Sequence, residues 1–585
     1  MVRSSACRKK CISSRFFYRV AHAAALRVLR APLASPATRA EVPQEFTLFS
    51  ARSTFFASLI FSLALAACGG NSTSSVTSPT TPGSGEPIAG KSTDYKLVSK
   101  LDEAVIAITL HEPTTMRAGE KYPLILQSHG YGNARVNAAQ RPTLSALHKG
   151  FIDRGYGFIS IDERGHGESG GTSRILEPEK EGQDLLQIID WAEATLPWLA
   201  YRDGNLLLGA TGSSYGGGFQ HLIYAIDPKR RLDAIAPEIT WNDLRYSLFE
   251  GGHHETYEKG VFKTFWATLL SAVGNAAGGG GKQDPEVTQG LAQGIATNTI
   301  DATKLALLYK NSIASYCAGK NPNGSVSKMD ALYWQSPHDT LFNLTDAVRN
   351  VQCLKAQGGD VRLLTKVGGH DTIVGGPAGE QCGKLKKDIA ILDWYDEKLK
   401  GLRGKAAYIP QFCWHLDASA DDGVVTTTLP TASTTFQVPT QTIAAQEGNM
   451  QVASIVLMKA GAGGAVIAGV PNISLKVSDS TPGAPQLGDP IVFVALAKRA
   501  AGASSDTLLM PNQVAPFRGY GNFTQDLIGV TSRLQADDEL RLVMYASYTL
   551  RYNGSASDVL APVTVEATAI NLPLLPGNLP APPAN

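Results

Sequence analysis

Residues 205–226 read NLLLGATGSSYGGGFQHLIYAI and combine two apolar runs with a turn rich in glycine and serine between them. The first apolar run predicts a buried strand and the second predicts a helix. The small and polar residues between them mark a sharp turn. Gly212, Ser214 and Gly216 form a G-x-S-x-G pattern in the turn, which is typical of a nucleophilic serine on a tight strand-to-helix connection. Ser213 is the rival serine, but it lies off the centre of the pattern. The stretch therefore predicts Ser214 as a nucleophile.

Strands and helices alternate on both sides of this turn. Residues 122–128 and 155–162 read as buried strands, and residues 182–198 carry apolar side chains at helical spacing. Downstream, residues 331–336 and 361–367 read as further strands. Such alternation predicts a mainly parallel sheet that is covered by helices on both faces.

A serine nucleophile needs a base, and the base needs an acid to orient it. Asp339 and His370 each follow the carboxyl end of a predicted strand, where catalytic loops lie in an open α/β sheet. Together with Ser214 they give the chain order serine, acid, histidine of the α/β-hydrolase fold. We therefore predict this fold, with Ser214, Asp339 and His370 as its catalytic triad.

Other histidines and acids fit this order less well. His129, His166 and His338 precede either the serine or the acid in the chain. We expect His129 to orient its loop and His166 to make a structural hydrogen bond in its glycine-rich turn. Asp346 and Asp371 are rival acids, but they are less well placed relative to a strand end.

The oxyanion hole needs donors that are aimed at the developing negative charge. The backbone N–H of Tyr215 follows the nucleophile directly and supplies one donor. The second is expected from the loop at residues 129–132, either from the N–H of Tyr131 or from its hydroxyl. The sequence does not decide between these two donors of Tyr131.

The interval between the serine and the acid is longer than a minimal hydrolase domain needs. Residues from about 242 to 330 contain apolar side chains at helical spacing, among them Phe265, Trp266 and Leu269. We expect a helical cap that restricts access and supplies an apolar pocket. The alternative is a packing extension that does not touch the substrate.

The composition changes after the hydrolase domain, which is expected over residues 95–405. Residues 406–575 hold short runs rich in Val, Ile, Thr and Leu between clusters of Gly, Pro, Asn and Asp. This pattern predicts an all-β sandwich or jelly roll. We expect it to pack against the hydrolase and to form one wall of the pocket, with carbohydrate binding as the alternative. Residues 576–585 are expected to be a loose tail.

The first part of the chain predicts export. A short apolar run at residues 54–67 follows Arg52 and ends in LAACG, which resembles the lipobox of bacterial lipoproteins. The resemblance implies a leader over residues 1–67 and a lipid on Cys68, with an ordinary signal peptide as the alternative. Residues 68–94 then read as a flexible tether. The expected location is the cell envelope, anchored by lipid in the outer membrane or periplasm, or outside the cell.

Charge and cysteine content limit the possible partners. The 585-residue chain has a formal net charge of +1, which gives no concentrated basic surface for nucleic acid. Its seven cysteines lack the spacing of a metal site, so we expect neither metal nor cofactor. If the chain is exported and Cys68 is modified, Cys317, Cys353, Cys382 and Cys413 can form two disulfides in three possible pairings.

Several of these motifs together resemble the X-prolyl dipeptidyl-peptidase and cocaine-esterase family of serine hydrolases. The matching stretches are DERGHGESGG from Asp162, GSSYGG from Gly212, TWND from Thr240, DTLF from Asp339 and the pair ending at His370. The resemblance implies the same triad, a role for Tyr131 in the oxyanion hole and a jelly roll at the C-terminus.

It also implies hydrolysis of an ester or amide in a small molecule or peptide. We favour an esterase, with an X-prolyl dipeptidyl-peptidase as the alternative and a catalytically inactive, lipid-anchored binding protein as a third reading.

Overall fold

The computed structural model describes residues 85–251, 259–276, 282–370, 379–416, 419, 421–481, 488–550, 552 and 558–585. The predicted leader, Cys68 and the first part of the predicted tether lie outside these residues. The described residues belong to one compact unit. No helix in this part of the chain combines the length and the apolar character that crossing a bilayer requires.

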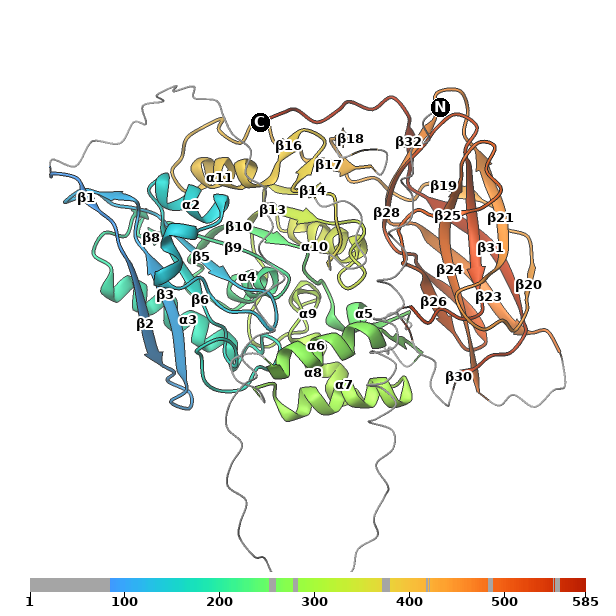
Figure 1. Ribbon diagram of the computed structural model, residues 1–585, viewed down its shortest axis with the longest axis horizontal. Helices are drawn as coiled ribbons and strands as arrows, with labels where there is room; N and C mark the ends of the chain where they lie inside the picture. The colour runs from blue at the N-terminus through green and yellow to red at the C-terminus, as the bar shows by residue number, and fades with distance from the viewer. Residues whose placement is uncertain are drawn as a thin grey trace, which may run out of the picture. The chain divides into compact units, whose positions relative to one another are not determined.

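A ten-stranded sheet is built from strands that lie between Ser92 and Thr426 (Figure 1). Its strands, in spatial order, are β18 (Gly423–Thr426), β17 (Phe412–His415), β14 (Val361–Thr365), β13 (Asp330–Gln335), β10 (Leu232–Glu238), β9 (Leu208–Ser213), β5 (Leu124–Ser128), β6 (Gly157–Ile161), β3 (Val105–His111) and β2 (Ser92–Val98). The strands from β17 to β6 are parallel, and β18, β3 and β2 are antiparallel additions at the two edges. The mainly parallel sheet predicted from the sequence is confirmed.

Helices cover both faces of this sheet. One face carries α3 (Glu181–Thr195), α4 (Tyr215–Ile226) and α10 (Leu344–Ala356), and the other carries α2 (Ala146–Asp153) and α11 (Lys387–Lys398). A short 3-10 helix, η1 (Ala138–Thr143), precedes α2.

Successive side chains of the inner strands point to opposite faces of the sheet. On β13, Ala331 and Tyr333 join the core beneath α4 and α10, whereas Leu332 and Trp334 join the core beneath α2 and α11. All four are buried. Because helices cover both faces, such strands carry unbroken apolar runs, which is the pattern that identified them in the sequence.

The cap lies between β10 and β13. Its elements are α5 (Leu244–Leu248), β11 (Phe249–Glu250), β12 (Val261–Phe262), α6 (Thr264–Ala276), α7 (Pro285–Thr297), α8 (Ala302–Lys310) and α9 (Ile313–Cys317). Two of its helices begin at aspartate caps, because the carboxylate of Asp284 accepts from the N–H of Glu286 and that of Asp301 from the N–H of Lys304. The described residues of the expected cap are therefore mainly helical, as predicted.

The C-terminal region is built of β-sheets, as predicted. One sheet contains β19 (Thr434–Phe436), β31 (Val563–Leu572), β23 (Asn472–Asp479), β27 (Gly521–Asp526) and β20 (Gln441–Ile443). The second contains β21 (Gln451–Lys459), β29 (Glu539–Tyr545), β24 (Asp489–Arg499), β25 (Thr507–Leu508), β26 (Ala515–Arg518) and β30 (Asp558–Val559). A third contains β28 (Val530–Leu534), β22 (Ala465–Gly469) and β32 (Leu574–Pro576). An apolar core between the sheets holds them together.

Three short strand pairs complete the described structure. They are β1 (Ile88–Ala89) with β4 (Thr115–Met116), β7 (Tyr201–Arg202) with β8 (Asn205–Leu206), and β15 (Gln381–Cys382) with β16 (Leu385–Lys386).

The β-region packs against the hydrolase and its cap. The side-chain amide of Gln513 donates to the carbonyl of Pro337 at 2.7 Å, and the guanidinium of Arg518 donates to the carbonyl of Asn298 at 2.7 Å. The first contact supports the loop that carries Asp339. The predicted packing of the two regions is therefore present.

Three boundaries differ from those expected. β2 (Ser92–Val98) begins inside the expected tether, which was to end at residue 94, and it pairs with β3 along its whole length. β17 and β18, expected in the β-region, belong to the hydrolase sheet, which continues to Thr426. The expected loose tail is bound, because the carbonyl of Pro580 accepts from the N–H of Val425 at 2.9 Å. β18 is an edge strand, so its N–H groups need partners outside the sheet. The composition of the tail does not reveal that it supplies one of these partners.

Two disulfides select one of the three possible pairings. Cys317 pairs with Cys353 and thereby joins the end of α9 to α10, with 5.9 Å between the Cα atoms. Cys382 pairs with Cys413 and joins β15 to β17, with 6.3 Å between the Cα atoms. Each bond closes a loop of moderate length and so restricts the unfolded chain.

We expect peptide mapping of the oxidised protein to find the pairs Cys317–Cys353 and Cys382–Cys413. The double variant C317S/C353S should lose up to about 4 kcal/mol of stability, because the cross-link no longer limits the unfolded chain. Urea unfolding of oxidised and reduced wild-type protein is the matched control. Any other pairing, or four titratable thiols in the oxidised protein, would contradict the assignment.

Candidate active site

A strained turn holds Ser214 between β9 and α4. Its backbone adopts φ 60° and ψ −117°, a region that residues with a side chain rarely occupy. A Cβ atom on Gly212 would lie 2.5 Å from the carbonyl oxygen of Gly216 and 2.7 Å from that of Ser128. A Cβ atom on Gly216 would collide with the carbonyl of Ser128. Both glycines of the G-x-S-x-G pattern are therefore required by the close approach of β5.

The three predicted triad residues form one hydrogen-bonded chain. The hydroxyl of Ser214 lies 2.9 Å from Nε2 of His370, and Nδ1 of His370 lies 2.7 Å from a carboxylate oxygen of Asp339. Ser214 follows β9, Asp339 follows β13 and His370 follows β14, so adjacent strand ends bring them together. This geometry lets the histidine take a proton from the serine while the carboxylate orients the ring.

The carboxylate of Asp339 is fixed by its own loop. Its second oxygen accepts from the N–H of Leu341 at 2.8 Å and from that of Phe342 at 2.9 Å. The side chain is fully buried. Two backbone donors and one imidazole therefore hold the carboxylate in a single orientation, which in turn fixes the histidine ring.

Two aromatic rings enclose His370. The ring centroids of Trp266, from cap helix α6, and of Phe342 lie 5.4 Å and 5.3 Å from that of the histidine, both edge-on. The indole N–H of Trp266 donates to the hydroxyl of Thr340 at 3.1 Å. The cap therefore contacts the catalytic base as well as covering the pocket, a role that the helical spacing of Trp266 in the sequence did not indicate.

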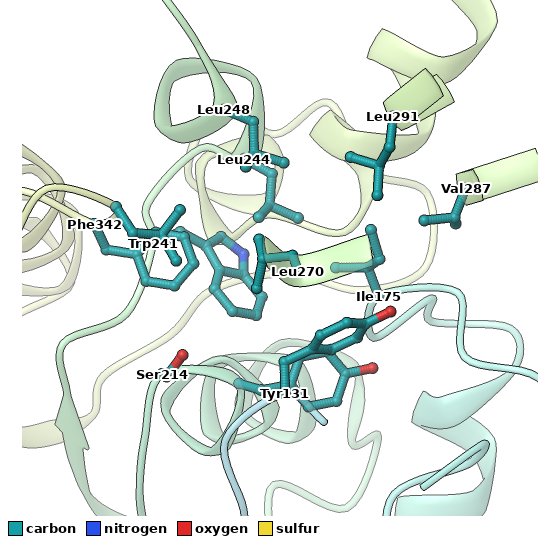
Figure 2. A pocket seen from close by; sticks show the side chains of 12 residues that line it. Tyr131, Ile175, Ser214, Trp241, Leu244, Leu248, Leu270, Val287, Leu291 and Phe342 are labelled. Atoms are coloured by element: carbon teal, nitrogen blue, oxygen red, sulfur yellow. The ribbon is translucent and has the colours of Figure 1, made fainter. Parts of the chain in front are cut away.

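The two expected oxyanion donors lie next to the nucleophile. Tyr215 is the first residue of α4, so its N–H has no partner within the helix. The hydroxyl of Tyr131 interacts with Ser173, and a Cβ atom on Gly274 of α6 would lie 2.8 Å from it. Burial raises the pKa of this hydroxyl. Figure 2 shows this hydroxyl pointing away from Ser214, which leaves the backbone N–H of Tyr131 as the candidate second donor.

The rival histidines have structural partners. Nδ1 of His129 lies 2.8 Å from the carbonyl of Gly130, and its Nε2 accepts from the N–H of Glu163 at 3.1 Å. Burial lowers the pKa of His129 to about 4, so the ring is neutral at physiological pH. Nδ1 of His166 lies 3.1 Å from the carbonyl of Arg164. These contacts match the loop-orienting and turn-stabilising roles that we expected.

The rival acids do not join the triad in the described structure. The carboxylate of Asp346 accepts from the N–H of Asn242 at 2.9 Å and from the hydroxyl of Ser247 at 3.2 Å. Burial raises the pKa of Asp346 to about 7. Asp371 lies outside the described residues. Asp339 is the acid that contacts His370.

An apolar pocket opens beside Ser214. Figure 2 places Trp241 and Phe342 near the serine, and Ile175, Val287 and Leu291 at the opposite end. Five of the lining residues belong to the cap, and none of those described is charged. The cap thus supplies part of the expected apolar pocket. The β-region contributes none of the lining residues described, contrary to our expectation that it forms a wall.

Two residues of the site were missed as functional groups. Trp241 lies in the TWND stretch that starts at Thr240, and the sequence assigned it no role. Its ring lines the pocket and fills the space above Gly218. The glycine run after the nucleophile is the signal that could have indicated a large ring there. Ile175 lines the end of the pocket that is far from Ser214, and its backbone adopts φ 62°. No sequence pattern predicts this conformation.

Among the residues that the structure describes, no group of three or more His, Cys, Asp or Glu side chains is arranged to hold a metal ion.

Comparison with known proteins agrees with this geometry. Residues 102–372, which include all three triad residues, match the model of the X-Pro dipeptidyl-peptidase (S15) family. An uncharacterised 31.7 kDa protein of Escherichia coli is 30% identical over 153 residues, which are 26% of this chain and 46% of that protein. The chain thus spans less than half the length of this curated relative.

Two solved structures share the fold at low sequence identity. A CocE/NonD family hydrolase from Staphylococcus aureus has a TM-score of 0.55 and 13% identity, covering 82% of this chain and 93% of its own. An α-amino acid ester hydrolase has a TM-score of 0.59 and 14% identity, covering 85% of this chain and all of its own. Residues 102–372 thus belong to the X-Pro dipeptidyl-peptidase (S15) family of serine hydrolases, and the chain is similar in fold to the CocE/NonD family hydrolase.

Proposed function

We propose that this serine hydrolase is a carboxylic ester hydrolase for substrates with an apolar acyl group. The observation that carries the proposal is the hydrogen-bonded chain from Ser214 through His370 to Asp339 at the mouth of an apolar pocket. The pocket places an acyl chain beside the nucleophile, and the described lining offers no charge to bind a charged group.

The reaction follows from the positions of these groups. His370 takes the proton of Ser214 as the hydroxyl attacks the ester carbonyl, and the N–H groups of Tyr131 and Tyr215 receive the developing oxyanion. The histidine then gives its proton to the leaving alcohol. Water, activated by the same histidine, releases the acid and restores the free serine. Asp339 stabilises the imidazolium in both halves of the reaction.

An ester is favoured over an X-prolyl peptide by the chemistry of the pocket. A dipeptidyl substrate brings a free ammonium group close to the scissile bond, and burying an unpaired charge is costly. The described lining residues contain no carboxylate that could pair with it. An ester with a hydrocarbon acyl group needs no such partner and gains from burial.

We expect the variant Ser214→Ala to lose labelling by a fluorophosphonate probe. Hydrolysis of p-nitrophenyl butyrate should fall by at least about 10⁴-fold, because the nucleophile is removed. Ser213→Ala is the matched control, since it removes a hydroxyl from the same turn and should retain labelling. Labelling that persists in the Ser214 variant would overturn the mechanism.

The substrate class can be tested by comparing a p-nitrophenyl ester with a p-nitroanilide, because both release a coloured leaving group. We expect kcat/KM for p-nitrophenyl butyrate to exceed that for Gly-Pro-p-nitroanilide by at least about 100-fold, because the pocket cannot pair the ammonium group. A dipeptide anilide without the free amine separates the effect of charge from that of the amide bond. Efficient cleavage of Gly-Pro-p-nitroanilide would favour the X-prolyl dipeptidyl-peptidase alternative.

We further place the protein in the cell envelope, attached through a lipid on Cys68. The two disulfides support an oxidising compartment, where such bonds persist. A lipid on Cys68 would attach the chain without a membrane-spanning helix, and stable anchoring of this kind takes more than one acyl chain or an additional basic patch.

The full chain, expressed in a Gram-negative host, should incorporate labelled palmitate and fractionate with membranes. Cys68→Ala should abolish incorporation because it removes the acceptor thiol, whereas Cys11→Ala should leave it intact. Equal labelling of all three proteins, or none in the wild type, would exclude the anchor.

A further inference from the structure

A second cavity lies under the cap, directly beyond the pocket that contains Ser214. It lies between α7, α8 and the end of α5. Ile175, Leu248, Val287 and Leu291 line both cavities. These four side chains therefore form the boundary between them, and Figure 2 shows three of them, Ile175, Val287 and Leu291, at the end of the first pocket that is far from the serine.

The boundary contains a strained backbone. Ile175 and Leu176 adopt φ 62° and 59°, an arrangement that is costly for any residue with a side chain and most costly for a β-branched one. Such strain persists only where the surroundings hold it in place, and it concentrates at functional sites.

Three hydrogen bonds hold the backbone around Ile175 and Leu176 in this strained conformation. The buried carboxylate of Glu181 accepts from the N–H groups of Arg174 and Glu177, which flank the strained pair. The N–H of Leu176 donates to the hydroxyl of Tyr215 at 3.1 Å. This loop is therefore built to keep the side chain of Ile175 at the junction of the two cavities.

The second cavity is apolar along its length and polar only at its outer end. Its walls include Phe262, Leu307 and Leu308, while Glu286 and Lys304 are the charged residues that line it. The side chain of Glu286 is 43% exposed, which places this end near solvent. The methylene groups of Lys304 cover Gly290, where a Cβ atom would lie 2.8 Å from them.

We propose that the second cavity is the distal part of the acyl-binding site, so that the enzyme takes esters of straight-chain fatty acids whose ends pass Ile175. This inference rests on the proposed ester hydrolysis at Ser214 and names the substrate class. A linear hydrocarbon chain fits because it is flexible, carries no polar group and can pass a constriction that a ring or branched group cannot.

The walls also explain why Ile175 determines specificity. A short acyl group fills only the first cavity and does not reach the boundary. A longer chain must pass between Ile175, Val287 and Leu291 to bury its remaining methylenes. Each methylene that becomes buried contributes roughly fourfold to kcat/KM, so the profile against chain length should rise until the outer end of the second cavity is reached.

The test is a series of p-nitrophenyl esters from acetate to palmitate, read as the ratio of kcat/KM for the decanoate to that for the acetate. Leu307→Phe fills the second cavity and should lower this ratio at least tenfold, whereas Leu307→Ala enlarges the cavity and should shift the optimum to longer chains. Ala306→Phe is the matched control, because Ala306 is exposed on the same helix, and it should leave the ratio unchanged.

A second measurement does not depend on turnover. Decanoate should bind to Ser214→Ala protein in calorimetry, and binding should weaken at least tenfold in the double variant S214A/L307F. A ratio that does not respond to Leu307, with acetate still hydrolysed through Ser214, would overturn the acyl channel and leave ester hydrolysis standing. Binding of decanoate in a protein that cleaves no ester would instead overturn the proposed function.

Discussion

The backbone of β5 and the turn before α4 approach so closely that no side chain fits between them, and the catalytic groups depend on this contact. The carbonyl of Ser128 faces both Gly212 and Gly216. The chain can pass this point only by turning sharply, which forces Ser214 to a positive φ and leaves its hydroxyl in the pocket. The same contact places the two candidate oxyanion residues near the turn, because α4 begins at Tyr215 and the loop with Tyr131 follows Ser128 directly.

Charges beneath the site join the strand ends on which the triad depends. The backbone carbonyl of Glu238, at the end of β10, accepts from the N–H of Ser214 at 2.9 Å. The carboxylate of the same residue pairs with Lys366 and Lys387, which hold its pKa well below the usual range despite burial. Lys366 lies four residues before His370. Removing either lysine would leave an uncompensated buried charge on Glu238. The cluster therefore holds the end of β10, which contacts Ser214, against the segment that leads to His370.

The sequence predicted the triad because each of its members depends on a local pattern. Apolar runs mark the strands, and catalytic groups follow strand ends, so Ser214, Asp339 and His370 could be found without knowing any contact. The boundaries failed where they depend on contacts between distant segments. The pairing of Ser92–Val98 with β3 and the binding of Pro580 to β18 leave no trace in composition. The strain at Ile175 is invisible for the same reason, since its causes are Glu181 and Tyr215.

Tyr215 connects the two strained points of the pocket. Its N–H lies beside the nucleophile, and its hydroxyl holds the N–H of Leu176 at the far wall. Positive φ values at Ser214 and at Ile175 thus occur at opposite ends of one apolar pocket, and Tyr215 is adjacent to the first in sequence and bonded to the residue after the second. A wall fixed in this way cannot adapt to the shape of a substrate. The substrate must adapt instead, which favours a flexible chain over a rigid group and makes the width at Ile175 the property that selects among esters.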